Sequence, residues 1–131
     1  LLKLTYLKYI FSMIEIFSKL YSDLHNTSYK EHSPLKRFFF NTKQHSLLVF
    51  YISSQKNQKS TLEDLCYNIS PKIISRSTIQ NILKEGVKIK FFEKKINTND
   101  KRAKYYLLTT EAKNIIKEWA HQQKNIFQVL E

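Results

Sequence analysis

A single glycine, Gly86, and two prolines, Pro34 and Pro71, occur among the 131 residues of this chain. Tight turns between β-strands depend on these residue types, so their scarcity disfavours a turn-rich β-sandwich or β-barrel. Hydrophobic residues form 42% of the chain and aromatic residues 14%, which is enough for a folded core despite a net charge of +11. We therefore expect one mainly helical domain over residues 1–131.

Apolar residues recur at helical spacing over residues 3–25 and again over residues 110–130. Faces this wide predict that the two terminal helices pack together and form a homodimer with a second copy of the chain. Purely internal packing is one alternative, and a membrane-surface helix is another. The side chains expected at the dimer interface are Leu7, Ile10, Phe11, Ile14, Phe17, Tyr21, Trp119, Ile126, Phe127 and Leu130.

Charged residues interrupt the N-terminal apolar run at Lys3, Lys8, Glu15 and Lys19. A membrane-spanning helix needs about 20 uninterrupted apolar residues, and a signal peptide needs an apolar centre without charges. Neither pattern is present. We expect a cytoplasmic protein without a membrane partner.

Helix-start signals predict short helices just before and within the central region, residues 42–109. Ser33-Pro34 predicts a helical turn that carries three consecutive phenylalanines. Three further helices are expected to begin at capping boxes, in which a polar residue and a Glu or Gln three positions later satisfy free backbone groups. These boxes are Asn41-x-x-Gln44, Ser60-x-x-Glu63 and Ser77-x-x-Gln80, and Ser75 is the alternative cap of the last helix.

Residues 75–109 combine a helix with two strands. An amphipathic helix is expected to reach about Ile89, with Gly86 either near its end or inside it. Two apolar-aromatic runs, FFEKKIN and AKYYLLT, then flank a polar tip, as in a β-hairpin. Ten Lys or Arg residues lie between positions 72 and 104, against three acids, and such a surplus favours binding to phosphates. This order predicts a helix-turn-helix followed by a hairpin wing, a winged helix that binds DNA.

The outward face of the predicted recognition helix carries side chains that can contact bases. Asn81 or Gln80 would suit adenine and Arg76 would suit guanine, while Ser, Thr and Lys would mainly hold phosphates. A solvated surface is the alternative. The expected DNA contacts are Ser75, Arg76, Ser77, Thr78, Gln80, Asn81, Lys84 and Lys88 on the helix, and Lys94, Lys95, Asn99, Asp100, Lys101, Arg102 and Lys104 on the wing.

The hairpin tip, Asp100-Lys101-Arg102, is followed by Leu108-Thr109 at the expected start of the last helix. This pattern resembles the MarR family of winged-helix regulators, whose wing shows D-x-R followed by L-T. The resemblance covers residues 41–113. It implies that Arg102 reaches the DNA minor groove and that Asp100 holds it. The family's Gly-Leu-Ile before the first wing strand is absent here.

The sequence carries few residues that could form disulfides, metal sites or nucleotide-binding loops. One cysteine, Cys66, excludes a disulfide within the chain and multi-cysteine zinc patterns, and we interpret it as a small buried residue rather than an oxidant sensor. One glycine excludes a dinucleotide fingerprint and a phosphate-binding loop. We expect no enzyme activity, no cofactor and no metal. The four histidines, which lack metal-ligand spacing and are interpreted as incidental, are His25, His32, His45 and His121.

The sequence thus predicts a homodimeric transcriptional regulator that binds double-stranded DNA and lies on the nucleoid. Recognition helix 76–89 would enter the major groove and wing 97–102 would contact the minor groove. A small effector of unknown identity is a further candidate partner. A winged-helix adaptor for protein contacts is one alternative. An RNA-binding module is another, with bases stacked on Phe91, Phe92, Tyr105 and Tyr106.

Overall fold

The computed structural model describes residues 2–27, 33–96, 99 and 104–130, and these form a mainly helical domain with a small antiparallel sheet. The expected fold class is confirmed at this level, including long terminal helices that pack together. The α-helices are α1 (Leu2–Thr27), α2 (Pro34–Phe40), α3 (Lys43–Ser54), α4 (Leu62–Asn68), α5 (Arg76–Lys88) and α6 (Thr110–Phe127). The strands are β1 (Lys59–Thr61), β2 (Phe92–Ile96) and β3 (Lys104–Leu108), and the short 3-10 helices are η1 (Lys56–Gln58) and η2 (Gln128–Leu130).

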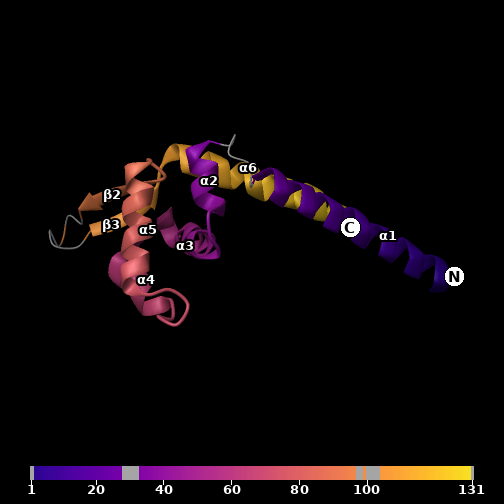
Figure 1. Ribbon diagram of the computed structural model, residues 1–131, viewed down its shortest axis with the longest axis horizontal. Helices are drawn as coiled ribbons and strands as arrows, with labels where there is room; N and C mark the ends of the chain where they lie inside the picture. The colour runs from indigo at the N-terminus through magenta and orange to yellow at the C-terminus, as the bar shows by residue number, and fades with distance from the viewer. Residues whose placement is uncertain (1, 28–32, 97–98, 100–103, 131) are drawn as a thin grey trace.

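The elements are arranged as a compact body with a long helical arm (Figure 1). Helices α1 and α6 lie side by side and run in opposite directions along the arm, and the N-terminal end of α1 projects past the end of α6. Helices α3, α4 and α5 and the sheet form the body at the other end. The N-terminus therefore lies far from the β2–β3 hairpin.

The sheet has the strand order β1-β3-β2, and both pairings are antiparallel. In the hairpin, Phe92 pairs with Leu108 and Ile96 pairs with Lys104, so the predicted hairpin is confirmed with slightly shorter strands. Strand β1 was not predicted. It is only three residues long and pairs Lys59 with Leu107, far along the chain, so no local pattern marks it.

Two of the predicted helix starts are shifted by one residue. Helix α3 is capped by Thr42 rather than Asn41. Helix α4 is capped by Thr61, which forms a capping box with Asp64, whereas Ser60 lies in β1 and is buried. In both places two neighbouring residues could act as caps. Asn41 has a helical backbone whereas Thr42 is extended, and Ser60 pairs with Tyr106 in the sheet, so that Thr61 is the residue directly before the helix.

The core joins the helices of the body to the hairpin. Phe39 of α2, Leu48 of α3, Leu65 of α4 and Phe91 before β2 are all completely buried in one hydrophobic cluster. Aromatic contacts strengthen it, since the Phe38 ring lies 4.9 Å from that of Phe91, centroid to centroid. The hairpin is thereby fixed relative to α5.

Helix α1 packs on the rest of the chain through one narrow face. Ile16 is buried there, Met13 and Leu20 are partly covered, and Gln123 Nε2 of α6 donates to Asp23 Oδ2 at 3.4 Å. Of the side chains predicted for the dimer interface on α1, only Ile10 is partly buried; the others are exposed. Among the described helices, none combines the length and apolarity needed to cross a membrane.

Candidate nucleic-acid interface

Helix α5 begins at a serine N-cap. Ser75 is the cap, and its Oγ accepts a hydrogen bond from the backbone N–H of Thr78 at 3.2 Å. Of the two caps predicted for this helix, Ser75 is confirmed, whereas Ser77 lies inside the first turn and its predicted capping box with Gln80 is wrong. The helix begins at Arg76, where the predicted recognition helix 76–89 begins.

One side of α5 is buried and the other is exposed and polar. Ile79, Ile82, Leu83 and Gly86 face the core, as the spacing predicted. Glu85, although exposed, points toward α3 and leaves the polar face without an acid. Of the predicted DNA contacts on this helix, Thr78 is half-buried, and the exposed ones are Ser75, Arg76, Ser77, Gln80, Asn81, Lys84 and Lys88.

Gly86 lies inside α5 because the helix touches the hairpin there. A Cβ at this position would overlap the Phe92 ring and come within 3.0 Å of Phe38 Cζ. The helix therefore continues through Gly86 and ends at Lys88, one residue short of the prediction. Close contact with Phe92 fixes the distance between α5 and β2.

The chain leaves α5 through a left-handed turn at Lys90, whose φ is 67°. The Phe91 N–H donates to Gly86 O at 2.8 Å and the Lys90 N–H donates to Val87 O at 3.2 Å, the two bonds of a Schellman motif. Thr109, at the start of α6, donates its hydroxyl to Lys90 O at 2.8 Å. This turn thus joins α5, the hairpin and α6.

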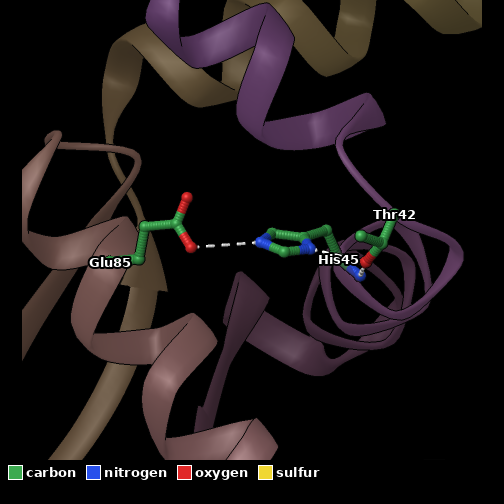
Figure 2. A network of polar contacts seen from close by, with 3 residues as sticks. All are labelled: Thr42, His45 and Glu85. Carbon is green, nitrogen blue, oxygen red and sulfur yellow. Dashed lines mark hydrogen bonds and ion pairs between the residues drawn. The ribbon is translucent and has the colours of Figure 1, made fainter.

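A buried histidine fixes the other side of α5 (Figure 2). His45 of α3 bonds through Nε2 to Glu85 Oε2 at 3.2 Å and through Nδ1 to Thr42 Oγ1 at 2.6 Å. A carboxylate only accepts, so the Nε2–H of His45 is the donor to Glu85. The interpretation of His45 as incidental is wrong, because this residue connects the start of α3 to α5.

The hairpin places lysines beside α5. Lys94 lies over the Tyr106 ring, with Nζ 5.9 Å from the ring centroid, and Lys95 forms an ion pair with Glu93 at 3.9 Å. Lys94, Lys95, Asn99 and Lys104 are exposed, as a nucleic-acid contact requires. The remaining predicted contacts at the tip, Asp100, Lys101 and Arg102, lie outside the described residues.

A surface groove of about 430 Å³ lies between the exposed side chains of α5 and those of the hairpin. Gln80, Asn81 and Lys84 line it from the helix, and Lys94 and Tyr106 line it from the strands. Amide, hydroxyl and ammonium groups therefore converge on one cleft, and all of them can donate hydrogen bonds to phosphate oxygens.

Arg76, predicted to contact guanine, is paired with an acid of α4. Its Nη2 donates to Glu63 Oε1 at 2.7 Å and its Nη1 donates to Glu63 Oε2 at 3.2 Å. This hydrogen-bonded guanidinium lowers the pKa of the Glu63 carboxyl. Sequence reasoning missed Glu63 as a partner, because the two residues lie 13 positions apart on different helices.

A second exposed surface lies on the helical arm and is apolar. Phe11, Phe17 and Tyr21 of α1 are 67%, 64% and 70% exposed, and Leu7, Ile14 and Leu24 lie beside them on the same side of the helix. Of the predicted interface residues on the C-terminal elements, Ile126 is buried and Trp119 is partly buried, while Phe127 and Leu130 are exposed. We call the exposed side chains of α1 the apolar arm face.

Comparisons of this chain with protein families, curated proteins and solved structures found no match. The description therefore rests on the fold itself, in which a three-stranded antiparallel sheet follows and joins short helices, an arrangement compatible with a winged helix. Within the described residues, no group of three His, Cys, Asp or Glu side chains could hold a metal ion. Cys66 of α4 is partly buried and packs against the core.

Proposed function

We propose that this chain is a homodimeric transcriptional regulator that binds double-stranded DNA and acts on the nucleoid in the cytoplasm. The observation that supports it best is the exposed, acid-free polar face of α5 beside the lysine-bearing hairpin. A helix with such a face fits the major groove, which admits one α-helix. Any solvated helix face is polar, but it does not need the bias toward basic side chains that this face and the hairpin share.

The contacts divide by chemistry. Asn81 and Gln80, with their amide groups, would contact base edges, and Lys84, Lys88 and Lys94 would hold phosphates on either side of the groove between α5 and the hairpin. The hairpin tip, residues 97–102, would contact the minor groove, where a narrow A/T-rich segment attracts an arginine such as Arg102.

The apolar arm face supports the homodimer. Its three aromatic side chains, Phe11, Phe17 and Tyr21, leave on the order of 400 Å² uncovered. A standard interface buries roughly 800 Å² on each partner, so this face and its neighbours are large enough to form one. Charged residues lie along one edge of this face, where Lys19 pairs with Glu15 at 3.1 Å, as a polar rim borders the apolar centre of an interface.

Salt dependence tests the proposal directly. If a dimer neutralises about six phosphates, the logarithm of its affinity for duplex DNA should fall with the logarithm of salt concentration at a slope of about −5. Fluorescence anisotropy with a labelled duplex would measure it, with light scattering on the same samples to establish the dimer. Affinity independent of salt would rule out DNA as the partner, and a monomer without DNA affinity would favour the adaptor.

The RNA-binding alternative is less well supported by the side chains. It needs exposed aromatic rings on the hairpin, whereas Phe91 and Phe92 are buried and Tyr105 and Tyr106 are half-buried. Competition between duplex DNA and single-stranded RNA would decide between the two nucleic acids.

A further inference from the structure

Glu63 and Arg76 form a bidentate ion pair at the edge of the proposed DNA-binding face. Arg76 is the first residue of α5, and Glu63 lies in the first turn of α4. The two hydrogen bonds of the pair measure 2.7 and 3.2 Å, and both side chains are more than half exposed. The pair is therefore within reach of a molecule that approaches the start of α5, the part of a recognition helix that contacts base edges.

A DNA duplex that binds Arg76 must also provide a hydrogen-bond donor for the Glu63 carboxylate. A phosphate would bind the guanidinium but would leave the carboxylate facing negative charge without a donor. An A·T pair offers the N6 amine of adenine to the carboxylate, but its two acceptors, adenine N7 and thymine O4, lie on different bases with that donor between them. A G·C pair offers two adjacent acceptors, guanine O6 and N7, and one donor, the cytosine N4 amine. Only this pair matches a planar fork and a carboxylate held side by side.

We propose that Glu63 and Arg76 together recognise a G·C base pair in the major groove. This inference rests on the proposed DNA-binding function. The Nη–H groups of Arg76 exchange the Glu63 oxygens for guanine O6 and N7, and the Glu63 carboxylate accepts a hydrogen bond from the cytosine N4 amine. At an A·T pair the carboxylate could still accept a hydrogen bond from adenine N6, but the two acceptors are not adjacent, so the Arg76 fork loses the Glu63 oxygens without gaining an equivalent pair. The ion pair therefore selects against A·T at this position.

The experiment compares the wild-type chain with Glu63→Gln and Arg76→Ala. Each protein is used to select binders from a random duplex pool, and dissociation constants are then measured on two duplexes that differ only by G·C or A·T at the selected pair. In the wild type, we expect a selected G·C pair that Arg76→Ala abolishes. In Glu63→Gln, affinity for the A·T duplex should rise, so that discrimination falls about tenfold.

Glu118→Gln is the matched control. Glu118 also forms an exposed ion pair, with Lys36 at 3.8 Å, but it lies on α6, so its substitution makes the same charge change away from α5. It should leave the discrimination unchanged. Circular dichroism would verify that all variants fold.

Two results would overturn the inference while leaving the proposed function intact. The first is that Glu63→Gln retains the same G·C preference as the wild type, and the second is that the selected sequence contains no pair that depends on Arg76. Failure of the wild type to select any duplex is a different result, since it rejects the proposed function and this inference with it.

Discussion

Helices α5 and α1 both expose one complete side, but the two exposed sides have opposite chemistry. On α5 the exposed side carries amides, hydroxyls and basic groups, and the apolar residues Ile79 and Leu83 are buried. On α1 the exposed side carries Phe11, Phe17 and Tyr21, and the apolar side chain that the fold buries is Ile16.

The difference shows which of the two surfaces is stable in water on the monomer and which needs a protein partner to cover it. The polar side of α5 is stable in water without a partner, so the protein does not need DNA to remain soluble. Contiguous apolar surface of the size seen on α1 is rare on monomers and usually marks an interface. We therefore assign the protein partner to α1 and the nucleic-acid partner to α5, and each prediction below tests that assignment.

The largest effect is expected from a charge on the apolar arm face. Phe17→Glu should raise the dimer dissociation constant about 100-fold, because an interface loses an aromatic side chain and gains an unpaired carboxylate. Sedimentation equilibrium would measure it. Ser22→Glu places the same charge on the polar side of α1 and should leave the dimer unchanged. Equal association of both variants would remove α1 from the interface.

The contact between α5 and the hairpin is tested by Gly86→Ala. The added methyl group meets the buried Phe92 ring and Phe38, so we expect the free energy of unfolding to fall by about 1–3 kcal/mol in urea titrations. An exposed glycine in a helix would behave in the opposite way, since alanine would stabilise it by about 1 kcal/mol. A stabilised variant would therefore contradict the close packing of α5 on β2.

The polar side of α5 is tested by two alanine variants with different signatures. Asn81→Ala should reduce discrimination between base pairs by about 1–3 kcal/mol, because an amide contact to a base edge is lost. Lys84→Ala should weaken binding to all sequences alike and reduce the salt slope by about 1. Arg102→Ala at the hairpin tip should also reduce the salt slope, but it should weaken binding most at sites with an A/T-rich minor groove. Anisotropy titrations on a panel of duplexes would show both. Uniform loss in every variant would contradict the division between base and phosphate contacts.

A smaller, opposite effect is expected at the end of α5. Lys90→Gly should stabilise the protein by about 0.5–1 kcal/mol, because glycine adopts the left-handed backbone at φ 67° without strain. Lys88→Gly, two residues earlier and still helical, should destabilise it by about 1 kcal/mol. Thermal unfolding of the pair would measure both shifts, and a destabilised Lys90→Gly would count against the Schellman motif.

The smallest effect concerns the acid beside α5. The guanidinium of Arg76 lowers the pKa of Glu63 in the folded protein, so the pair stabilises the fold above the usual carboxyl pKa of about 4.3 and this stabilisation disappears as pH falls through the lowered value. The melting temperatures of wild type and Glu63→Gln should differ slightly at pH 7 and converge in acid. A difference that persists at low pH would exclude the ion pair as its cause.

Much of the fold could be predicted because its signals are local. Apolar spacing located the terminal helices and the buried side of α5, and two aromatic runs located the hairpin. The starts of α3 and α4 were misplaced by one residue, because Asn41 beside Thr42 and Ser60 beside Thr61 are equally good caps in sequence. The surrounding fold decides between such neighbours, through the helical backbone of Asn41 at the end of α2 and the pairing of Ser60 in the sheet.

The contacts that sequence reasoning missed join residues far apart in the chain. His45 bonds to Glu85 across 40 positions, and Glu63 pairs with Arg76 across 13. Periodicity also could not show which side of α1 packs internally, since apolar residues surround most of that helix. The exposed polar face of α5 was predictable, whereas the acid that restrains its first residue was not.

The part of α1 that projects past α6 also bears on how the protein unfolds. Leu2, Leu4 and Tyr6, near its free end, are exposed, and a lone helix of this kind is only marginally stable in water. If a second copy supplies the missing contacts, ordering the arm becomes part of association. The midpoint of thermal denaturation would then climb as the protein becomes more abundant, so that expression level itself would govern how long each molecule remains intact.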